Sequence, residues 1–406
     1  MFNFFVLLIK NKEVKGIEMI DVKHYTKNHG SQNIPLAFEE AYALGTLVLQ
    51  GCRGDRQAQI QSIALLSQLH TKATYKWEWD QRIEVIHGHR LPQNAAEQIA
   101  GVCAAVFEYD IGKSEYGFLN PDVPYAMDNC GMGGDLIVTA NVSTIAAFIA
   151  AVDGIPMCKH GSPANADQGR HGSSDFIELC GINNFASKKD IEFCVQDLGF
   201  GYTEALDTRY KLIHLQTHKV AQMPHMNDII GPITNPLNPK ILKRRVLGIN
   251  HLISPVIVAQ AYQILNERKI TFLEHGLFIR GFGDNGEDSG MDELSICKGG
   301  TQLAELKNGA INEYWLRAED FGIASVIEGS VCPPEGMSKG DFSLAILKGE
   351  ITGPPVQMIA ANAALLFYLA GKSQDLKECY RMAEEILLSG KAYQKMLAVQ
   401  QLIPRK

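Results

Sequence analysis

The sequence has few of the features of a secreted, membrane-spanning or strongly basic protein. Its nine Cys are scattered through 406 residues without a C-x-x-C pair. We therefore expect reduced, buried thiols in a cytoplasmic protein, and neither a disulfide framework nor a zinc site. The apolar start, residues 1–9, is too short to cross a bilayer and lacks the basic region of a signal peptide. A net charge of −7 disfavours sequence-independent nucleic-acid binding, although residues 240–245 could form a local basic groove.

Length and hydrophobic spacing predict two domains in an ordinary globular chain. In the first part, Ala41, Leu44, Leu47 and Val48 recur at three and four residues, a helical pattern. Further along, strand-like segments alternate with helix-like ones, which favours an α/β fold with a mostly parallel central sheet. The predicted division is an N-terminal extension 1–35, a small helical domain 36–107 joined by part of 205–240, a Gly-, Pro- and Asp-rich linker 108–125, and an α/β domain 126–406.

Within the α/β part, the pattern predicts individual elements. We expect short strands at 155–158, 246–249 and 277–279, and helices at 143–152, 254–266, 356–369 and 376–402. Ser173 is predicted to cap a helix running to residue 180. The Gly- and acid-rich segment 281–290 is interpreted as a flexible loop that acts as a lid or is a plain insertion.

A glycine-rich turn and the helix start behind it form the first candidate site. Glycines at 131, 133 and 134, followed by Asp135, allow positive φ and close approach of a ligand, and successive N–H groups can hold anionic oxygens. The next helix begins where free N–H groups and the helix dipole also favour an anion. The alternatives are a plain tight turn and a simple helix cap by Asn141 or Ser143.

Two further groups carry charge. Lys159, His160 and Gly161 follow a predicted strand, and ligands of open α/β sheets bind at the carboxyl ends of strands. Asp292 and Glu293 are adjacent acids that can hold Mg²⁺, which prefers oxygen ligands. The alternatives are a solvated lysine with a hydrogen-bonded histidine, and an ordinary acidic pair at the surface.

The order of these motifs resembles that of the anthranilate phosphoribosyltransferase family, glycosyltransferase family 3. The likeness covers roughly residues 36–402. The matching segments are Gly131–Asp135, Thr139–Thr144, Lys159–Gly161, Gly231–Pro236, Asp292 with Glu293, Asn362–Leu365 and Ser389–Ala392. The resemblance implies a small helical domain on a larger α/β domain, with the site in the hinge between them. It also implies phosphoribosyl pyrophosphate as the donor, Mg²⁺ as the cofactor and a homodimer.

The resemblance also assigns roles to residues. It implies that phosphoribosyl pyrophosphate is bound by Gly131, Gly133, Gly134, Asp135, Thr139, Asn141, Ser143, Thr144 and Lys159. It implies that the metal is held by Ser143, Asp292 and Glu293. On the acceptor side, the candidate residues are His160, Gly161, Ser162, Arg170, His214, Thr217 and His218.

The departures from the family pattern gather on the acceptor side. Met132 replaces a Thr in the glycine turn, and Ser162 replaces an Asn. Thr217 stands where the family has the Arg that pairs with the anthranilate carboxylate, and Thr cannot make that bidentate, charge-assisted bond. His214 and His218, spaced i, i+4, could position another acceptor or form a polar helix face.

Three functions remain open from the sequence. The leading one is Mg²⁺-dependent phosphoribosyl transfer to an aromatic or nitrogen-heterocyclic acceptor. The second is authentic anthranilate phosphoribosyltransfer in tryptophan biosynthesis, with the carboxylate held by Arg209 or Arg170. The third is a non-enzymatic relative that binds nucleic acid, which the acidic balance disfavours.

Overall fold

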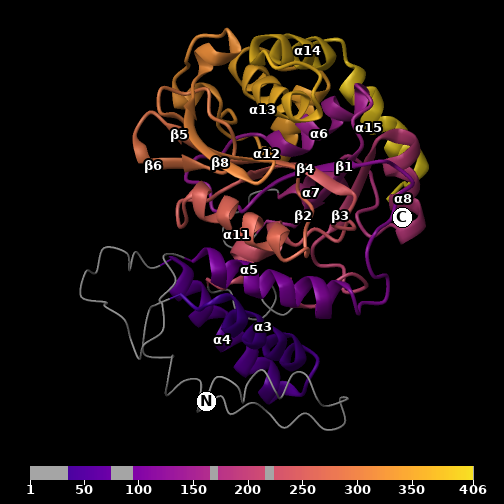
Figure 1. Ribbon diagram of the computed structural model, residues 1–406. Coiled ribbons are helices and arrows are strands. Elements are labelled where there is room, and N and C mark those ends of the chain that lie inside the picture. The colour runs from indigo at the N-terminus through magenta and orange to yellow at the C-terminus, as the bar shows by residue number, and fades with distance from the viewer. Residues whose placement is uncertain (1–34, 75–94, 165–171, 215–223, 406) are drawn as a thin grey trace. The chain divides into compact units, whose positions relative to one another are not determined.

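A central sheet organises the part of the chain that the structure describes, residues 35–74, 95–164, 172–214 and 224–405 of a computed structural model (Figure 1). Its strand order is β3-β2-β1-β4-β5-β7-β8, with β6 paired to β5. The first five strands in this order run parallel, whereas β6 and β7 pair antiparallel with β5, and β8 pairs antiparallel with β7. The strands are β1 Ala126–Gly131, β2 Met157–Gly161, β3 Phe200–Glu204, β4 Leu242–Gly248, β5 His275–Gly283, β6 Gly286–Met291, β7 Gly300–Lys307 and β8 Ala310–Leu316.

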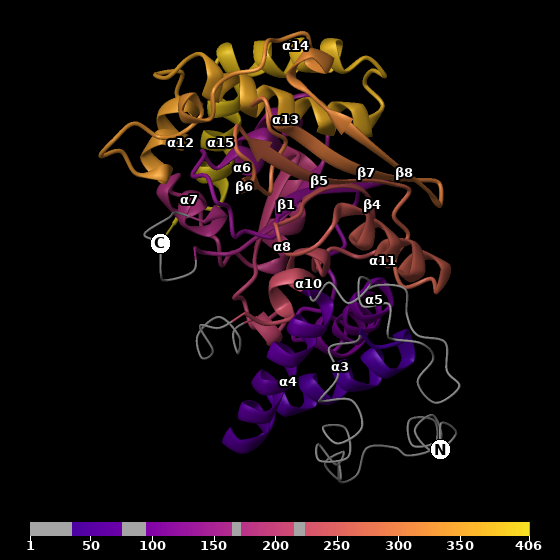
Figure 2. The same ribbon diagram turned by 90° about the vertical axis from the view of Figure 1, so that its left-hand side faces the viewer.

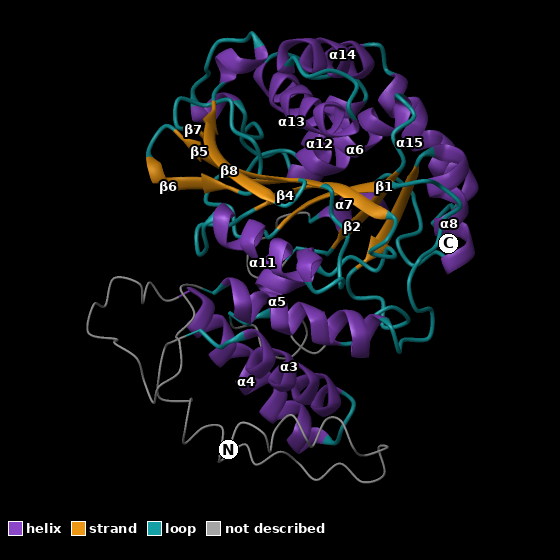
Figure 3. Ribbon diagram, viewed as in Figure 1, coloured by secondary structure: helices purple, strands orange, loops and turns teal. Residues whose placement is uncertain are grey.

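Helices cover both faces of this sheet, which is why its central strands are apolar. Every residue of β5 is buried, as expected for a strand covered on both faces. Figures 2 and 3 show α6, α13 and α14 on one face, and α11 on the other. These helices are α6 Val142–Val152, α11 Pro255–Glu267, α12 Lys339–Leu347, α13 Pro354–Ala370, α14 Leu376–Leu388 and α15 Lys391–Leu402. The predicted α/β class with a mostly parallel sheet is therefore confirmed.

The N-terminal helices pack together and reach the sheet layer through α11. Helix α3 (Phe38–Cys52) contacts both α4 (Arg56–Thr74) and α5 (Ala96–Ala105), and α5 contacts α11. Among the described helices, none combines the length and apolar character needed to cross a membrane. All nine cysteines are free thiols, and all but Cys332 are buried. The division into a helical and an α/β domain stays a prediction.

Several element boundaries differ from the sequence expectations. The linker expected from residue 108 begins later, because α5 continues as a π-helix, Val106–Ile111. Its Asp110 is buried and accepts hydrogen bonds from the amides of Leu212 and Ile213. The helix expected over 376–402 is two helices, interrupted at Gly390, whose φ is 74°.

Two local expectations also change at the strand ends. The segment 281–290, expected to be a flexible loop, forms the β5–β6 hairpin, with Phe282 paired to Gly290. The N-cap of α7 (Ser173–Leu179) is Gly172 and not Ser173, and the Gly172 amide donates to Asp175 at 2.7 Å. The remaining short helices are α8 Lys188–Phe193, α10 Asn227–Ile233, a π-helix Cys194–Leu198, and 3₁₀ turns Ala318–Phe321 and Glu328–Ser330.

Candidate active site

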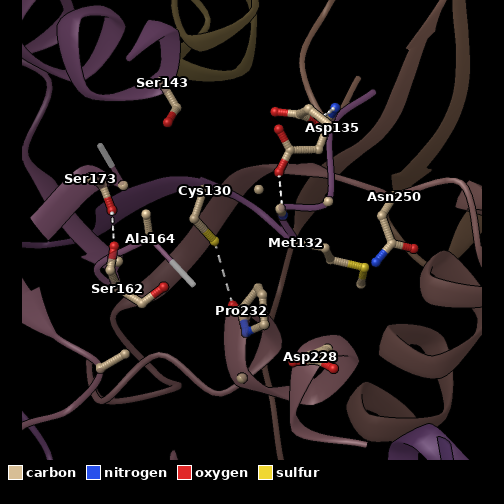
Figure 4. A pocket seen from close by; sticks show the side chains of 18 of the residues that line it. Cys130, Met132, Asp135, Ser143, Ser162, Ala164, Ser173, Asp228, Pro232 and Asn250 are labelled. Carbon is tan, nitrogen blue, oxygen red and sulfur yellow. Dashed lines mark hydrogen bonds between the residues drawn. The ribbon is translucent and has the colours of Figure 1, made fainter. Parts of the chain in front are cut away.

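A cavity of about 410 Å³ lies at the carboxyl ends of β1 and β2 (Figure 4). Ligands of open α/β sheets bind at this edge. Its wall contains most of the donor-side residues expected from the sequence, and it also receives residues from α4, α10 and α12. The expected residues that line it are Gly131, Gly133, Gly134, Asp135, Asn141, Ser143, Lys159, His160, Gly161, Ser162, His214, Asp292 and Glu293.

Three carboxylates converge on one side of the cavity. Asp135, Asp292 and Glu293 place one oxygen each within 4.8 Å of one another. Burial, followed by the charges of Asp292 and Glu293, raises the pKa of Asp135 well above its usual value. Burial and the Asp292 charge raise the pKa of Glu293 to about 7. Acids crowded in this way are relieved by a divalent cation, and hard oxygen ligands suit Mg²⁺.

The acid cluster is held in place by the glycine turn and by a threonine. The Gly133 amide donates to Asp292 Oδ2 at 2.6 Å, and the Asp292 amide donates to Asp135 Oδ1 at 2.7 Å. Thr139 Oγ1 donates to Glu293 Oε2 at 3.0 Å. Thr139, expected to touch the donor substrate, is not part of the cavity wall and instead orients a carboxylate.

The turn needs glycine for two separate reasons. Gly133 and Gly134 have φ of 73° and 81°, a region that other residues adopt only with strain. A side chain at position 131 would collide with the Asp292 carboxylate. The Met132 and Gly133 amides are already bonded to Gly248 O and Asp292. Within the described residues, the Gly134 amide makes no such bond and is the turn's available donor for an anion.

Lys159 and Ser143 form a polar pair beside the turn. Lys159, only 1% exposed, donates from Nζ to Asn129 O at 2.6 Å and to Ser143 Oγ at 3.0 Å. Burial lowers the pKa of its ammonium. Thr144, expected to bind the donor, does not line the cavity, and its buried hydroxyl has no hydrogen-bond partner in the described part of the chain.

Asn141 precedes α6 at the N-cap position but does not cap it with its side chain. Its amide and its Nδ2 both donate to Ser343 Oγ, at 2.7 and 3.1 Å. Ser343 belongs to α12, 202 residues further along the chain. In place of the expected cap, Asn141 thus links the start of α6 to α12 through two hydrogen bonds. No local sequence signal indicated this contact.

His160 is held in one tautomer. Its Nδ1 lies 3.0 Å from Thr203 Oγ1 and 3.2 Å from Thr203 O. The Thr203 hydroxyl donates its own proton to Lys159 O, so both neighbours of Nδ1 act as acceptors and Nδ1 carries the hydrogen. Burial, and then the charges of Lys211 and His214, lower the pKa of His160 well below its usual value. Its Nε2, without a partner among the described residues, is therefore a neutral hydrogen-bond acceptor.

The part of the cavity that is predicted to bind the acceptor is lined by histidines that are distant in the sequence. His70 comes from α4, His214 and His225 precede α10, and Asp228 lies in the first turn of α10. Asn227 and His214 are joined through Nδ2 and Nδ1 at 2.6 Å. His70 and Asp228 were missed because nothing local in the sequence links α4 to α10. The candidates Arg170, Thr217 and His218 lie outside the described residues.

Arg209 is not available to hold an acceptor carboxylate. Its guanidinium donates to both oxygens of Asp207, at 2.7 Å for the shortest bond, and to Tyr116 Oη at 2.9 Å. It does not line the cavity. The suggestion that Arg209 recognises anthranilate is therefore wrong in this arrangement, because its charge is already paired.

Fold and site together define an α/β glycosyltransferase. Residues 123–393 match the family described as "Glycosyl transferase family, a/b domain", and the chain belongs to that family. It is similar to curated anthranilate phosphoribosyltransferases. One from Halorhodospira halophila is 30% identical over 313 residues, covering 76% of this chain and 83% of the relative. One from Clostridium kluyveri is 33% identical over 274 residues, covering 67% and 76%.

Solved structures show the same likeness. The anthranilate phosphoribosyltransferase of Thermus thermophilus superimposes with a TM-score of 0.67 at 25% identity, over 91% of this chain and 97% of its own. The Saccharomyces cerevisiae enzyme in complex with PRPP and Mg gives a TM-score of 0.70 at 20% identity, over 95% and 99%. The second likeness, at this lower identity, concerns the fold.

Proposed function

We propose that this enzyme transfers a 5-phosphoribosyl group from phosphoribosyl pyrophosphate to an aromatic or nitrogen-heterocyclic acceptor in a Mg²⁺-dependent reaction. The observation that carries the proposal is the cluster of Asp135, Asp292 and Glu293, which shares a cavity with the buried Lys159. A metal ion on the carboxylates and the lysine ammonium would together offset the charge of a pyrophosphate leaving group. The relatives named above support the same donor chemistry.

In this reaction the protein would mainly bind, orient and neutralise charge. Bound Mg²⁺ would stabilise the pyrophosphate as it leaves C1 of the ribose. Lys159 is fixed by two hydrogen bonds, so it would meet the leaving group without reorganising. Ser143, which accepts one of these bonds, is retained as a proposed metal ligand. His160 Nε2, an acceptor by its tautomer, would receive the N–H or O–H of the attacking nucleophile.

Titration calorimetry with phosphoribosyl pyrophosphate tests this proposal. We expect micromolar binding in the presence of Mg²⁺, and a loss of about tenfold or more in Asp292→Asn and Glu293→Gln, because each removes a charged oxygen ligand. Glu350→Gln, at an exposed position after α12, is the matched control and should bind as the wild type does. Absence of binding to the wild-type protein, with or without Mg²⁺, would refute the proposal.

Anthranilate remains the alternative acceptor, because the curated relatives carry that name. The paired state of Arg209 and the presence of Thr217 speak against it, since a carboxylate needs a free cationic partner. Complementation of a tryptophan auxotroph separates the two. Growth supported by the well-expressed protein would establish anthranilate as the acceptor and overturn the proposed change of acceptor.

A further inference from the structure

A second lysine, distant in the sequence from Lys159, lines the cavity that contains the acid cluster. Lys339 is the first residue of α12 and lines the same cavity as Asp135, Asp292 and Glu293. It is close enough for its charge to lower the pKa of both Asp135 and Glu293. Its ammonium has no hydrogen-bond or ion-pair partner in the part of the chain that the structure describes.

Helix α12 is anchored so that this lysine stays at the cavity. Ser338 caps the helix by accepting from the Asp341 amide at 3.0 Å. One turn further, the fully buried Ser343 donates to Lys339 O at 2.6 Å and accepts both bonds from Asn141. Lys339 is therefore connected through Ser343 to the start of α6, where the donor pyrophosphate is proposed to bind.

The charge balance around the carboxylate cluster indicates why a second lysine would be needed to bind an anion. When ionised, the three carboxylates of the cluster are only cancelled by one Mg²⁺ and Lys159 together. The fourth carboxylate that lines the cavity, Asp228, lies 3.2 Å from His225 Nδ1. A further cation is needed before the wall has a net attraction for an anion, and Lys339 is the other cation among the described residues that line the cavity. Its partial burial weakens the screening that an exposed lysine would experience.

We propose that Lys339 is a second pyrophosphate-binding cation, which contacts the leaving group from the α12 side while Lys159 contacts it from β2. This inference rests on the proposed function and adds a substrate-binding residue to it. Lys159 is buried and already makes two hydrogen bonds, whereas Lys339 keeps all its donors available. The two lysines would thus hold opposite sides of one anion, with the metal on the carboxylates between them.

Inorganic pyrophosphate and Mg²⁺ alone are the probes that test this role. In Lys339→Met, we expect the affinity for pyrophosphate with Mg²⁺ to fall by about tenfold or more, the usual scale for losing a charged hydrogen bond. The affinity for Mg²⁺ alone should rise, because a repelling charge next to the carboxylates is gone. These opposite signs separate a charge role from a structural one, which would weaken both.

Two variants serve as controls. Lys348→Met removes an exposed lysine just beyond the other end of α12 and should change neither affinity. Lys339→Arg keeps the charge and should retain most of the pyrophosphate affinity. If Lys339→Met binds pyrophosphate as the wild type does, or loses both affinities together, this inference is overturned while the proposed function stands. If the wild-type protein does not bind pyrophosphate with Mg²⁺, both fall.

Discussion

At the residue scale, the site depends on side chains whose protonation is fixed by their neighbours. His160 shows this directly. Two acceptor oxygens of Thr203 face Nδ1, so Nδ1 carries the hydrogen and Nε2 offers a lone pair. A substrate carboxylate placed at Nε2 would bring a second lone pair to that nitrogen, whereas the N–H or O–H group of a nucleophile would donate a hydrogen bond to it. The tautomer thus favours acceptors that present a hydrogen.

The first prediction concerns this nitrogen. We expect His160→Phe to lower kcat/KM for the acceptor by about 10² or more, the usual range for a lost proton acceptor. The Kd for phosphoribosyl pyrophosphate with Mg²⁺ should stay within about twofold, because the hydrogen bonds of this imidazole go to Thr203 and not to the carboxylates or to Lys159. Steady-state kinetics and calorimetry on the same preparation measure both. An equal loss in the two quantities would mean that the substitution disturbs the whole site.

Residue types and spacing in the sequence were enough to pick out Lys159, Asp292 and Glu293, because each stands in a short motif with a chemical reason. The metal cluster itself was only partly predicted, since Asp135 had been assigned to the ribosyl and pyrophosphate part. Lys339 and Ser343 had no such motif. Their contribution depends on α12 lying against the start of α6, a contact that only the folded chain creates.

At the element scale, a buried ion pair fixes the strands behind the site. Arg245 on β4 and Asp128 on β1 are both fully buried and 2.7 Å apart. The same guanidinium donates to the carbonyls of Pro232 and Ile233, which end α10. Residues 240–245 were expected to allow a basic groove, but Arg245 is buried and does not contribute to such a surface. Its charge is paired inside the fold.

The second prediction is that removing one partner of this buried pair strongly destabilises the fold. Arg245→Met should lower the free energy of unfolding by about 3–5 kcal/mol, because it leaves the Asp128 carboxylate buried without its partner. Arg244→Met is the matched control. That neighbour lies over the Tyr125 ring and donates to Ala370 O, so its loss should cost only about 1 kcal/mol. Urea denaturation followed by circular dichroism compares them, and similar losses in both variants would contradict the expectation.

Element types were predictable from periodicity, but their ends were set by tertiary contacts. The π-helix at Val106–Ile111 persists because Asp110 is paired with Arg53 at 3.0 Å and with two amides of the segment after β3. Composition alone assigned that stretch to a linker. In the same way, the paired hairpin at 281–290 overrides a composition that is typical of loops.

At the scale of the whole molecule, buried acids make stability depend on pH in two opposite directions. Burial alone would raise the pKa of Glu305, but hydrogen bonds from His275, Tyr314 and Tyr368 lower it to about 2. Its folded pKa lies below the usual 4.5, so its contribution is present above that value and is lost as pH falls towards 2. Glu293 behaves in the reverse way.

The last prediction follows from Glu293 and Asp135. Their folded pKa values are raised, to about 7 for Glu293, so the metal-free folded state binds more protons than the unfolded chain at intermediate pH. The stability that Glu293 contributes is complete below about pH 4.5 and is lost as pH rises through about 7. Asp135, whose pKa is also raised, changes the stability in the same direction. We therefore expect the Tm in EDTA to fall by a few degrees between pH 5 and pH 8.

Mg²⁺ should reverse that loss, because it binds the ionised carboxylates and so stabilises the folded state most where they have lost their protons. At pH 8, adding MgCl₂ should raise the Tm more than at pH 5. Glu293→Gln should weaken both the pH dependence in EDTA and the gain from Mg²⁺, whereas Glu350→Gln should leave them unchanged. Differential scanning calorimetry at pH 5 and pH 8, in EDTA and in MgCl₂, measures these changes in Tm. A wild-type Tm that gains equally from Mg²⁺ at pH 5 and pH 8 would show that these carboxylates do not titrate as the cluster geometry requires.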